Sequence, residues 1–383
     1  MKIELTPELE EMRAQVRRFT ERELEPLAGE IDATGEIPQK AWDLMRDAGY
    51  LGMRLPEEYG GASASLSAMC LVLEELSRSH RVFTGLIDAT SGLTPSAFVR
   101  HGSLEQRERY VRKLATGEMR AAFALTEPGA GSDSAAISTS ATRADGGWII
   151  NGRKHFISSG HLADVVMVMT VTDAQKRARG GITALLVERS TPGFSVTRVD
   201  TTIGSEAWKL AELTFENCFV PDSAVMGKVG EGFKIAMESL TDGRMAVACC
   251  CIGAADRLLE MATAHAQQRV TFGKPLAERQ AIQWMLADTA VDIATARALT
   301  YETLRQIEAG KNIGSAASMC KLYSSEMIGR VTDRAIQIFG GQGLIRGFPI
   351  ERFYRDVRHY RIGEGTSEVH RMLIARDLLQ TRC

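Results

Sequence analysis

A carboxylate lies between two glycines near the C-terminus, in Gly363-Glu364-Gly365, and two hydroxyl residues, Thr366 and Ser367, follow it. Apolar residues recur at helical spacing from position 369 onward, so the pattern predicts a helix that begins near Ser367 with Thr366 or Ser367 as its cap. Glu364 then occupies a turn with a permissive backbone at the positive end of that helix. Taken alone, the pattern also fits an ordinary exposed loop carboxylate.

A second stretch, FALTEPGAGSD at 123–133, is rich in glycine and hydroxyl side chains. Glycines let a backbone approach a ligand closely, and free N–H and O–H groups can bind phosphate or the carbonyl oxygens of a ring. The stretch contains neither G-K-[ST] nor G-x-G-x-x-G, which excludes the two common nucleotide-binding loops. Its spacing alone fits a generic glycine turn as well as a ligand-binding loop.

The bulk properties are those of a globular protein. The chain has 383 residues, enough for two or three domains, with 44% hydrophobic and 25% charged residues. The formal net charge of −2 gives no reason to expect a nucleic-acid or membrane partner. The charged start MKIELTPELEEMRAQVRRF lacks the apolar core of a signal peptide, and we expect a cytoplasmic location.

The seven cysteines do not predict a disulfide framework, because their number is odd and no C-x-x-C spacing occurs. Cys249, Cys250 and Cys251 are consecutive in a helical stretch and are expected to fill the core. The histidines show no H-E-x-x-H or other paired-ligand spacing, so no metal is expected.

The elements predict an α+β chain in three parts. Residues 1–120 should form an N-terminal helical domain, with helices after the Thr6-Pro7-Glu8 start signal, at 38–49, at 66–76 and after the Ser103 capping box. Residues 121–230 should form a middle antiparallel β-barrel or sandwich, with a hairpin at 148–157 that turns at Asn151-Gly152. The other strands are expected at 165–172, 182–188, 194–199 and 211–220. Residues 231–383 should form a C-terminal four-helix bundle, with long helices at 232–270, 280–309 and 315–339.

Five motifs in a fixed order make the reading specific. FALTEPGAGSD is followed by KHFISSG, RVTFGKP with Gln280, QIFGGQG and IGEGTSEVHR. This series resembles the acyl-CoA dehydrogenase family across essentially the whole chain. The resemblance implies noncovalently bound FAD and α,β-desaturation of an acyl-CoA thioester in fatty acid metabolism. It also implies electron transfer to an electron-transfer flavoprotein, and a homotetramer, or dimer of dimers, in which a neighbouring subunit completes each flavin site.

The resemblance assigns cofactor-binding residues motif by motif. Those of the flavin's own subunit would be Phe123, Leu125, Thr126, Ser132, Phe156 and Ser158. Those reaching the FAD of the partner subunit would be Arg269, Phe272, Gln280, Gln337, Gly340 and Gly341, while Thr366 and Glu368 would also touch FAD. Plainer alternatives are that Phe156 is a core strand residue, that Arg269 forms an ion pair within its own chain, and that the two glycines merely end a helix.

Glu364 becomes the implied catalytic base. Desaturation requires a base at the α-carbon and a hydride acceptor, flavin N5, at the β-carbon. In the family, the ribityl hydroxyl of the flavin and the backbone N–H of the base polarise the thioester carbonyl. Some relatives place the base on a central helix, just before an arginine. The corresponding stretch here is Leu240-Thr241-Asp242-Gly243-Arg244, with glycine in that position, which favours Glu364.

The resemblance also gives substrate contacts, at Ser132, Thr241, Arg244 and Gly365. Many relatives carry aspartate where Thr241 stands and use it to hold the pantetheine chain, and a threonine hydroxyl can also hydrogen-bond an amide of that chain. Gly363 stands where tyrosine is common, which would widen the acyl pocket and admit a bulkier chain. Phe156 stands where tryptophan is common and should still stack on the flavin.

Three alternatives keep the same scaffold. An oxidase would pass electrons to O₂, and a reductase would run the reaction from an enoyl-CoA ester. A noncatalytic or DNA-associated flavoprotein is a different class of function, and the near-neutral charge together with Glu364 argues against it. The motifs do not specify the acyl chain.

Overall fold

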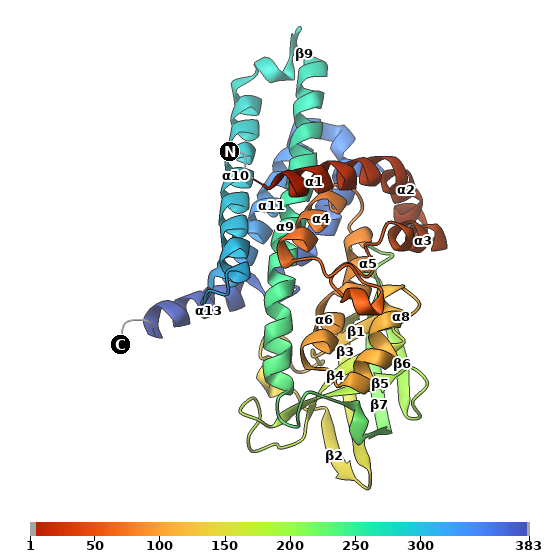
Figure 1. The fold of residues 1–383 in the computed structure, drawn as a ribbon. Helices are drawn as coiled ribbons and strands as arrows, with labels where there is room; N and C mark the ends of the chain where they lie inside the picture. Colours follow the sequence, from red (N-terminus) through yellow and green to blue (C-terminus); the bar gives the residue numbers. More distant parts are fainter. Residues whose placement is uncertain (1–4, 381–383) are drawn as a thin grey trace.

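The computed structural model describes residues 5–380, which form a helical, a β and a second helical region in chain order (Figure 1). The first region contains α1 (Pro7–Phe19), α2 (Glu25–Thr34), α3 (Gln39–Asp47), α4 (Leu66–Leu76), α5 (Val82–Ser91), α6 (Leu93–His101), α7 (Leu104–Gln106) and α8 (Arg112–Ala115). The Thr6 side chain caps α1, and Ser103 and Gln106 form the expected capping box. Helices α2, α5 and α6 were not predicted from the sequence.

The middle region is one eight-stranded sheet. Its strands are β1 (Ala121–Ala124), β2 (Ser140–Ala144), β3 (Gly147–Ser158), β4 (Val165–Val171), β5 (Ile182–Glu188), β6 (Phe194–Asp200), β7 (Leu210–Pro221) and β8 (Val225–Met226). The order is β6-β7-β3-β2-β4-β5-β8, with β1 added beside β4. Most neighbours are antiparallel as predicted, but β4 pairs in parallel with both β1 and β2.

The predicted hairpin at 148–157 is wrong, because β3 runs straight through Asn151 and Gly152. Both halves of β3 pair with the same strand, β7, and the register shifts between Ile150 and Gly152. The Asn151 side chain accepts a hydrogen bond from the backbone N–H of Asn217 on β7, at 2.8 Å. The Asn-Gly pair therefore makes a bulge within a long strand, since pairing with β7 on both sides outweighs the local turn preference.

The C-terminal region is a bundle of three long helices, α9 (Gly232–Gln268), α10 (Gln280–Glu308) and α11 (Ala316–Phe339), with the shorter α12 (Pro349–Asp356) and α13 (Ser367–Gln380) packed against it. Helix α9 extends from beside the sheet to the opposite end of the molecule, where the small strands β9 (Val270–Thr271) and β10 (Lys274–Pro275) connect it to α10 (Figure 1). None of the helices within residues 5–380 has both the length and the apolar composition needed to cross a membrane.

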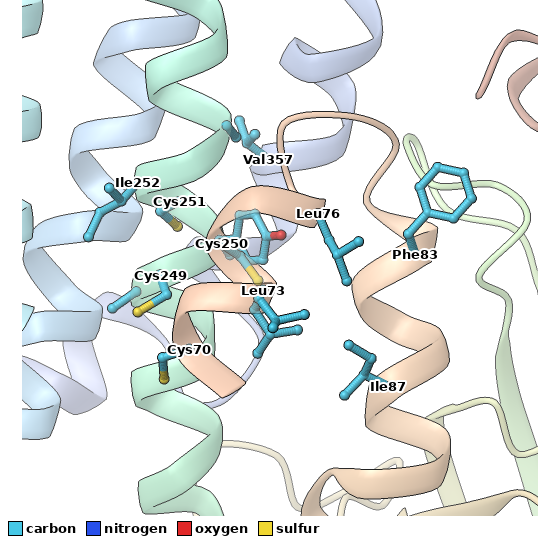
Figure 2. Close-up of a cluster of buried hydrophobic side chains, with 14 of the residues drawn as sticks. Cys70, Leu73, Leu76, Phe83, Ile87, Cys249, Cys250, Cys251, Ile252 and Val357 are labelled. Atoms are coloured by element: carbon cyan, nitrogen blue, oxygen red, sulfur yellow. The ribbon is translucent and has the colours of Figure 1, made fainter. Parts of the chain in front are cut away.

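The predicted role of the cysteine run is confirmed. Cys249, Cys250 and Cys251 on α9 lie in the core where α9 packs against α4, near Cys70 and Leu73 (Figure 2). The pKa of each of the three thiols is raised, by the hydrogen bond with Cys70 and then by burial for Cys249, and chiefly by burial for Cys250 and Cys251. They therefore stay protonated and fill space. Cys383 lies outside the described residues.

Candidate active site

Glu364 occupies a strained turn between a short 3₁₀ segment (Val357–Arg361) and α13. Its φ is +58° and that of Gly365 is +97°, both in the left-handed region that glycine adopts easily and glutamate rarely does. The Thr366 hydroxyl accepts the backbone N–H of Val369 at 3.3 Å, so Thr366 caps α13 as the sequence predicted. Strain at a carboxylate is typical of a functional position.

The Glu364 carboxylate is enclosed and underbonded. Its Oε2 is buried and has no hydrogen-bond partner, although the residue as a whole is half-buried. A Cβ built on Gly243 of α9 would lie 2.8 Å from this Oε2 and 3.0 Å from Leu93 Cδ2 of α6. The carboxylate therefore packs directly against the backbone of α9, at the position where some relatives were expected to carry their base.

Burial and, after it, the like charge of Asp88 on α5 together raise the pKa of Glu364 to about 7. Arg244 and Lys321 act in the opposite direction and favour the ionised form. Such a carboxyl group is poised to exchange a proton near neutral pH, as a general base requires. Burial also raises the pKa of Asp88, although part of its side chain remains exposed.

The turn is attached to α11 on both sides of the base. Lys321, which is fully buried, donates from Nζ to the Gly365 carbonyl at 2.5 Å. Ser367 donates from its hydroxyl to Glu326 at 2.5 Å, and Arg361 lies 3.7 Å from the same carboxylate. Lysine is almost never fully buried without a partner, because burial of its charge is costly. The contacts of Lys321 with this turn therefore indicate that it serves the function of the turn.

Two of the predicted cofactor motifs are brought together at β1 and β3. The backbone N–H of His155 donates to the Thr126 carbonyl at 2.9 Å, which places the loop after β1 beside the end of β3. Phe156 has φ +57°, is 56% exposed and stacks on His155 with ring centroids 3.8 Å apart. Phe156 is thus not a core strand residue, and its free face is available to a planar ligand. Phe123, Thr126 and Ser158 are half-buried, Leu125 is buried and Ser132 is exposed.

A buried ion pair fixes this loop. Lys154 donates to Glu127 Oε1 at 2.8 Å and to the Leu125 carbonyl at 2.9 Å. Glu127 also accepts the backbone N–H groups of Ser138 and Thr139 at 2.7 and 2.9 Å. These donors lower the pKa of Glu127 to about 2, while burial lowers that of Lys154 to about 8, so both groups are charged at neutral pH.

Replacing Lys154 by methionine should therefore destabilise the fold by about 3–5 kcal/mol, because Glu127 would keep a buried and uncompensated charge. Urea unfolding monitored by circular dichroism measures the difference. Lys154→Met combined with Glu127→Gln is the control and should recover part of the lost stability. Equal stability of Lys154→Met and the wild type would show that the pair does not hold the loop.

The remaining cofactor motifs lie at the opposite end of the bundle. Arg269 follows α9, Phe272 lies between β9 and β10, Gln280 begins α10, and Gln337, Gly340 and Gly341 lie at the end of α11. The stacked rings of His265 and Phe339, 4.2 Å apart, join the ends of α9 and α11. Gly243 and Arg269 are about 39 Å apart along α9. One chain therefore does not bring its two sets of cofactor residues together.

Both sets fit a flavin dinucleotide. A Cβ placed on Gly129 or Gly131 in the first set, or on Gly340 or Gly341 in the second, would meet nothing within 4 Å, so the backbone is open to a ligand there. Phe272 is 98% exposed and Arg269 is exposed with no ion pair among residues 5–380. The guanidinium is thus free to bind a phosphate. Gly340 also ends α11, with φ +60°.

The residues predicted to bind substrate do not divide between the two ends of the bundle, because Arg244, Gly365 and Thr241 lie near Glu364 and Ser132 lies on the loop after β1. Arg244 and Gly365 lie beside Glu364, and Thr241 lies one helical turn before Arg244 on α9. The Thr241 hydroxyl donates to the Met237 carbonyl of its own helix at 3.2 Å. Asp242 points elsewhere, as expected, since it pairs with Arg100 and Arg54. Glu368 is exposed.

Three residues near the base were missed from the sequence: Asp88, Lys321 and His370. His370 is fully buried on α13 with neither ring nitrogen hydrogen-bonded, and burial lowers its pKa to about 4, so it is neutral. No local pattern in the sequence marks these three residues, and only the tertiary fold shows that they lie near Glu364.

Comparison with known proteins gives matches along the chain. Residues 6–118 match the model "Acyl-CoA dehydrogenase, N-terminal domain", 122–218 the corresponding middle domain and 230–379 the C-terminal domain. Acryloyl-CoA reductase (NADH) of Anaerotignum propionicum is 38% identical, over 99% of this chain and 96% of that protein. An acyl-CoA dehydrogenase of Bacillus subtilis is 37% identical, over 98% and 99%.

The fold matches as well. The solved structure of butyryl-CoA dehydrogenase from Megasphaera elsdenii superposes with a TM-score of 0.92 at 34% identity, covering 99% of this chain and all of that one.

Proposed function

The chain belongs to the acyl-CoA dehydrogenase family, and from that premise we propose that it desaturates an acyl-CoA thioester between the α- and β-carbons, with Glu364 as the base that takes the α-proton. The observation that carries the proposal is the Glu364 carboxylate: enclosed, without a hydrogen-bond partner at Oε2, and held in a left-handed turn. A group that is costly to bury and strained at its backbone is best explained by chemistry.

The surroundings of Glu364 suit this role. Leu93 and the backbone of Gly243 exclude water from one side of the carboxylate, which strengthens the interactions that remain. Arg244 and Lys321 favour its ionised form, and the pKa of about 7 lets it hold a proton after abstraction. FAD, when bound, supplies the hydride acceptor. The residues of this chain that would hold it are Phe123, Leu125, Thr126, Ser132, Phe156, Ser158, Thr366 and Glu368.

A second copy of the chain is proposed to complete each flavin site. The separation of the two cofactor sets along α9 supports this, because residues around Arg269 can serve only a cofactor in another subunit. Large exposed apolar side chains support it too, with Trp284 60% and Val291 66% exposed on α10, and Leu344 70% exposed after α11. We propose a homotetramer built as a dimer of dimers.

Replacing Arg269 by alanine should weaken FAD retention by about tenfold to a hundredfold, the value of a hydrogen bond to a charged group. The A450 to A280 ratio after gel filtration measures retained FAD, and light scattering reports the assembly. Lys274→Ala, which removes an exposed cation from the same turn, is the control and should retain FAD. Full FAD retention in Arg269→Ala would contradict completion of the site by a neighbour.

The proposal is tested by anaerobic titration of the FAD-loaded protein with acyl-CoAs of linear and branched chains. Bleaching of the oxidised flavin absorbance by one chain class is expected and would identify the substrate. Transfer of those electrons to an electron-transfer flavoprotein, the acceptor we propose, is followed in the same cuvette. If no acyl-CoA reduces the flavin, the dehydrogenase proposal fails.

A second candidate is reduction of an enoyl-CoA, because a relative of 38% identity is named acryloyl-CoA reductase (NADH). The same groups would act in reverse, with the protonated form of Glu364 donating to the α-carbon. Chemically reduced protein mixed with enoyl-CoA would then reoxidise rapidly. Rapid reoxidation without any bleaching by acyl-CoA would favour the reductase.

A further inference from the structure

The inference concerns Lys321 on α11 and rests on the proposed role of Glu364. Lys321 is fully buried, yet it has no carboxylate within ion-pair distance among the described residues. Its Nζ donates a hydrogen bond to a neutral acceptor, the Gly365 carbonyl, at 2.5 Å. A buried ammonium usually requires an opposite charge in direct contact, so its presence here needs another explanation.

The acceptor itself points to the explanation. The Gly365 carbonyl belongs to the residue directly after the base, in the turn where Glu364 and Gly365 both have positive φ. That carbonyl fixes the orientation of the peptide on the C-terminal side of Gly365, and hence the path of the turn. On the other side of the turn, Glu326 of the same helix holds Ser367 and lies near Arg361. Helix α11 thus clamps the turn, and Lys321 is the contact closest to the base.

The charge of Lys321 also reaches the base, although the two are not in contact. Glu364 faces Asp88 on α5, Arg244 on α9, Lys321 on α11 and the neutral His370 on α13. Lys321 itself faces the Cys251 thiol and Arg244 on α9, and Glu326 on its own helix. Of these groups, only Arg244 and Lys321 stabilise the Glu364 carboxylate, and both lower its pKa. Removal of either cation should therefore raise that pKa.

We propose that Lys321 is a positioning residue for the catalytic base: by donating to the Gly365 carbonyl it fixes the turn that presents Glu364 to the acyl α-carbon, and it places a positive charge near the Glu364 carboxylate. Lys321 touches neither the reacting carbon nor the proton that is transferred. It acts through the geometry and the protonation state of Glu364.

The test compares Lys321→Met with the wild type, both as FAD-loaded protein and with an acyl-CoA that reduces the flavin. Misplacement of the base should lower the limiting rate of flavin reduction by about tenfold to a hundredfold with little change in KM. In addition, the acid limb of the kcat/KM profile, which reports ionisation of the free base, should shift to higher pH. A merely structural residue would not shift that limb.

Thr332→Val is the matched control, because Thr332 is buried on the same helix and its hydroxyl donates only within α11, to Ile328 and Gly329. It should leave both the rate and the acid limb unchanged. If Lys321→Met loses FAD or fails to fold, Lys321→Gln replaces it in the test. Glutamine also lacks the positive charge, so it should shift the acid limb of kcat/KM in the same direction. A wild-type rate and an unshifted limb in a folded Lys321 variant would overturn the inference.

Glu364→Gln, measured in the same series, separates this inference from the proposed function. If Glu364→Gln reduces flavin at the wild-type rate, the proposed function fails and the inference fails with it. If Glu364→Gln is inactive while the Lys321 variants match the wild type in rate and pH profile, the proposed function stands and only the inference about Lys321 fails.

Discussion

Glu364→Gln is expected to slow reduction of the flavin by substrate at least about 10³-fold, because a glutamine amide cannot accept the α-proton and a positioned general base supplies factors of this order. The change preserves the size of the side chain and removes its charge. FAD content should not change, since the flavin contacts proposed for this turn come from Thr366 and Glu368. Stopped-flow measurement of flavin absorbance at saturating acyl-CoA gives the rate.

Asp88→Asn is the discriminating companion, because Asp88 is the other carboxylate whose charge acts on Glu364. Loss of the Asp88 charge should leave desaturation in place and lower the pKa of Glu364. The acid limb of the kcat/KM profile should then lie at lower pH than in the wild type. An inactive Asp88→Asn beside an active Glu364→Gln would assign the base to Asp88. That result would require a different mechanism.

Gly243→Ala is expected to cost about a hundredfold in the rate of flavin reduction, the loss that follows from moving a catalytic group by about 1 Å. The added methyl group would lie 2.8 Å from Glu364 Oε2 and 3.0 Å from both its Cδ and Leu93 Cδ2, all closer than carbon and oxygen atoms pack. The carboxylate is the more movable partner and should be displaced from the acyl α-carbon. The rate at saturating acyl-CoA measures the effect.

Gly29→Ala is a suitable control for this substitution. Gly29 lies inside α2, a Cβ there meets nothing within 4 Å, and alanine is the better helix former. Its activity should equal that of the wild type, with slightly higher stability. If Gly243→Ala also has wild-type activity, Glu364 is not confined by α9 in the way that the packing indicates.

Much of the fold could be predicted from local signals. Thr6 and Pro7 at the start of α1, the Ser103 capping box and the helix after Thr366 follow from chemistry within a few residues, and the structure confirms all three. The run of three cysteines was correctly assigned to the core because small apolar residues recur around it. The ordered motifs gave the family, which no single one of them could have done.

The errors come from interactions between distant segments. Asn151-Gly152 has the strongest local turn signal in the chain, yet pairing with β7 on both sides keeps β3 continuous. Three neighbours of Glu364 were missed for the same reason: Asp88, Lys321 and His370 lie on three different helices. No spacing rule connects them, and only packing of these helices around Glu364 brings them together.

The left-handed backbone and the enclosed carboxylate of Glu364 both lower the stability of the folded protein. A non-glycine residue in the left-handed region costs about 1–3 kcal/mol, and an enclosed carboxylate without a full set of partners adds to that. The chain thus gives up stability at Glu364, the residue to which we assign the proton transfer, so that stability and the proposed activity make opposite demands on this position. Glycine at position 364 would relieve the backbone strain and remove the enclosed carboxylate, so an inactive Glu364→Gly protein should be correctly folded and should melt at a higher temperature than the wild type. Selection for thermal stability alone would therefore favour loss of Glu364.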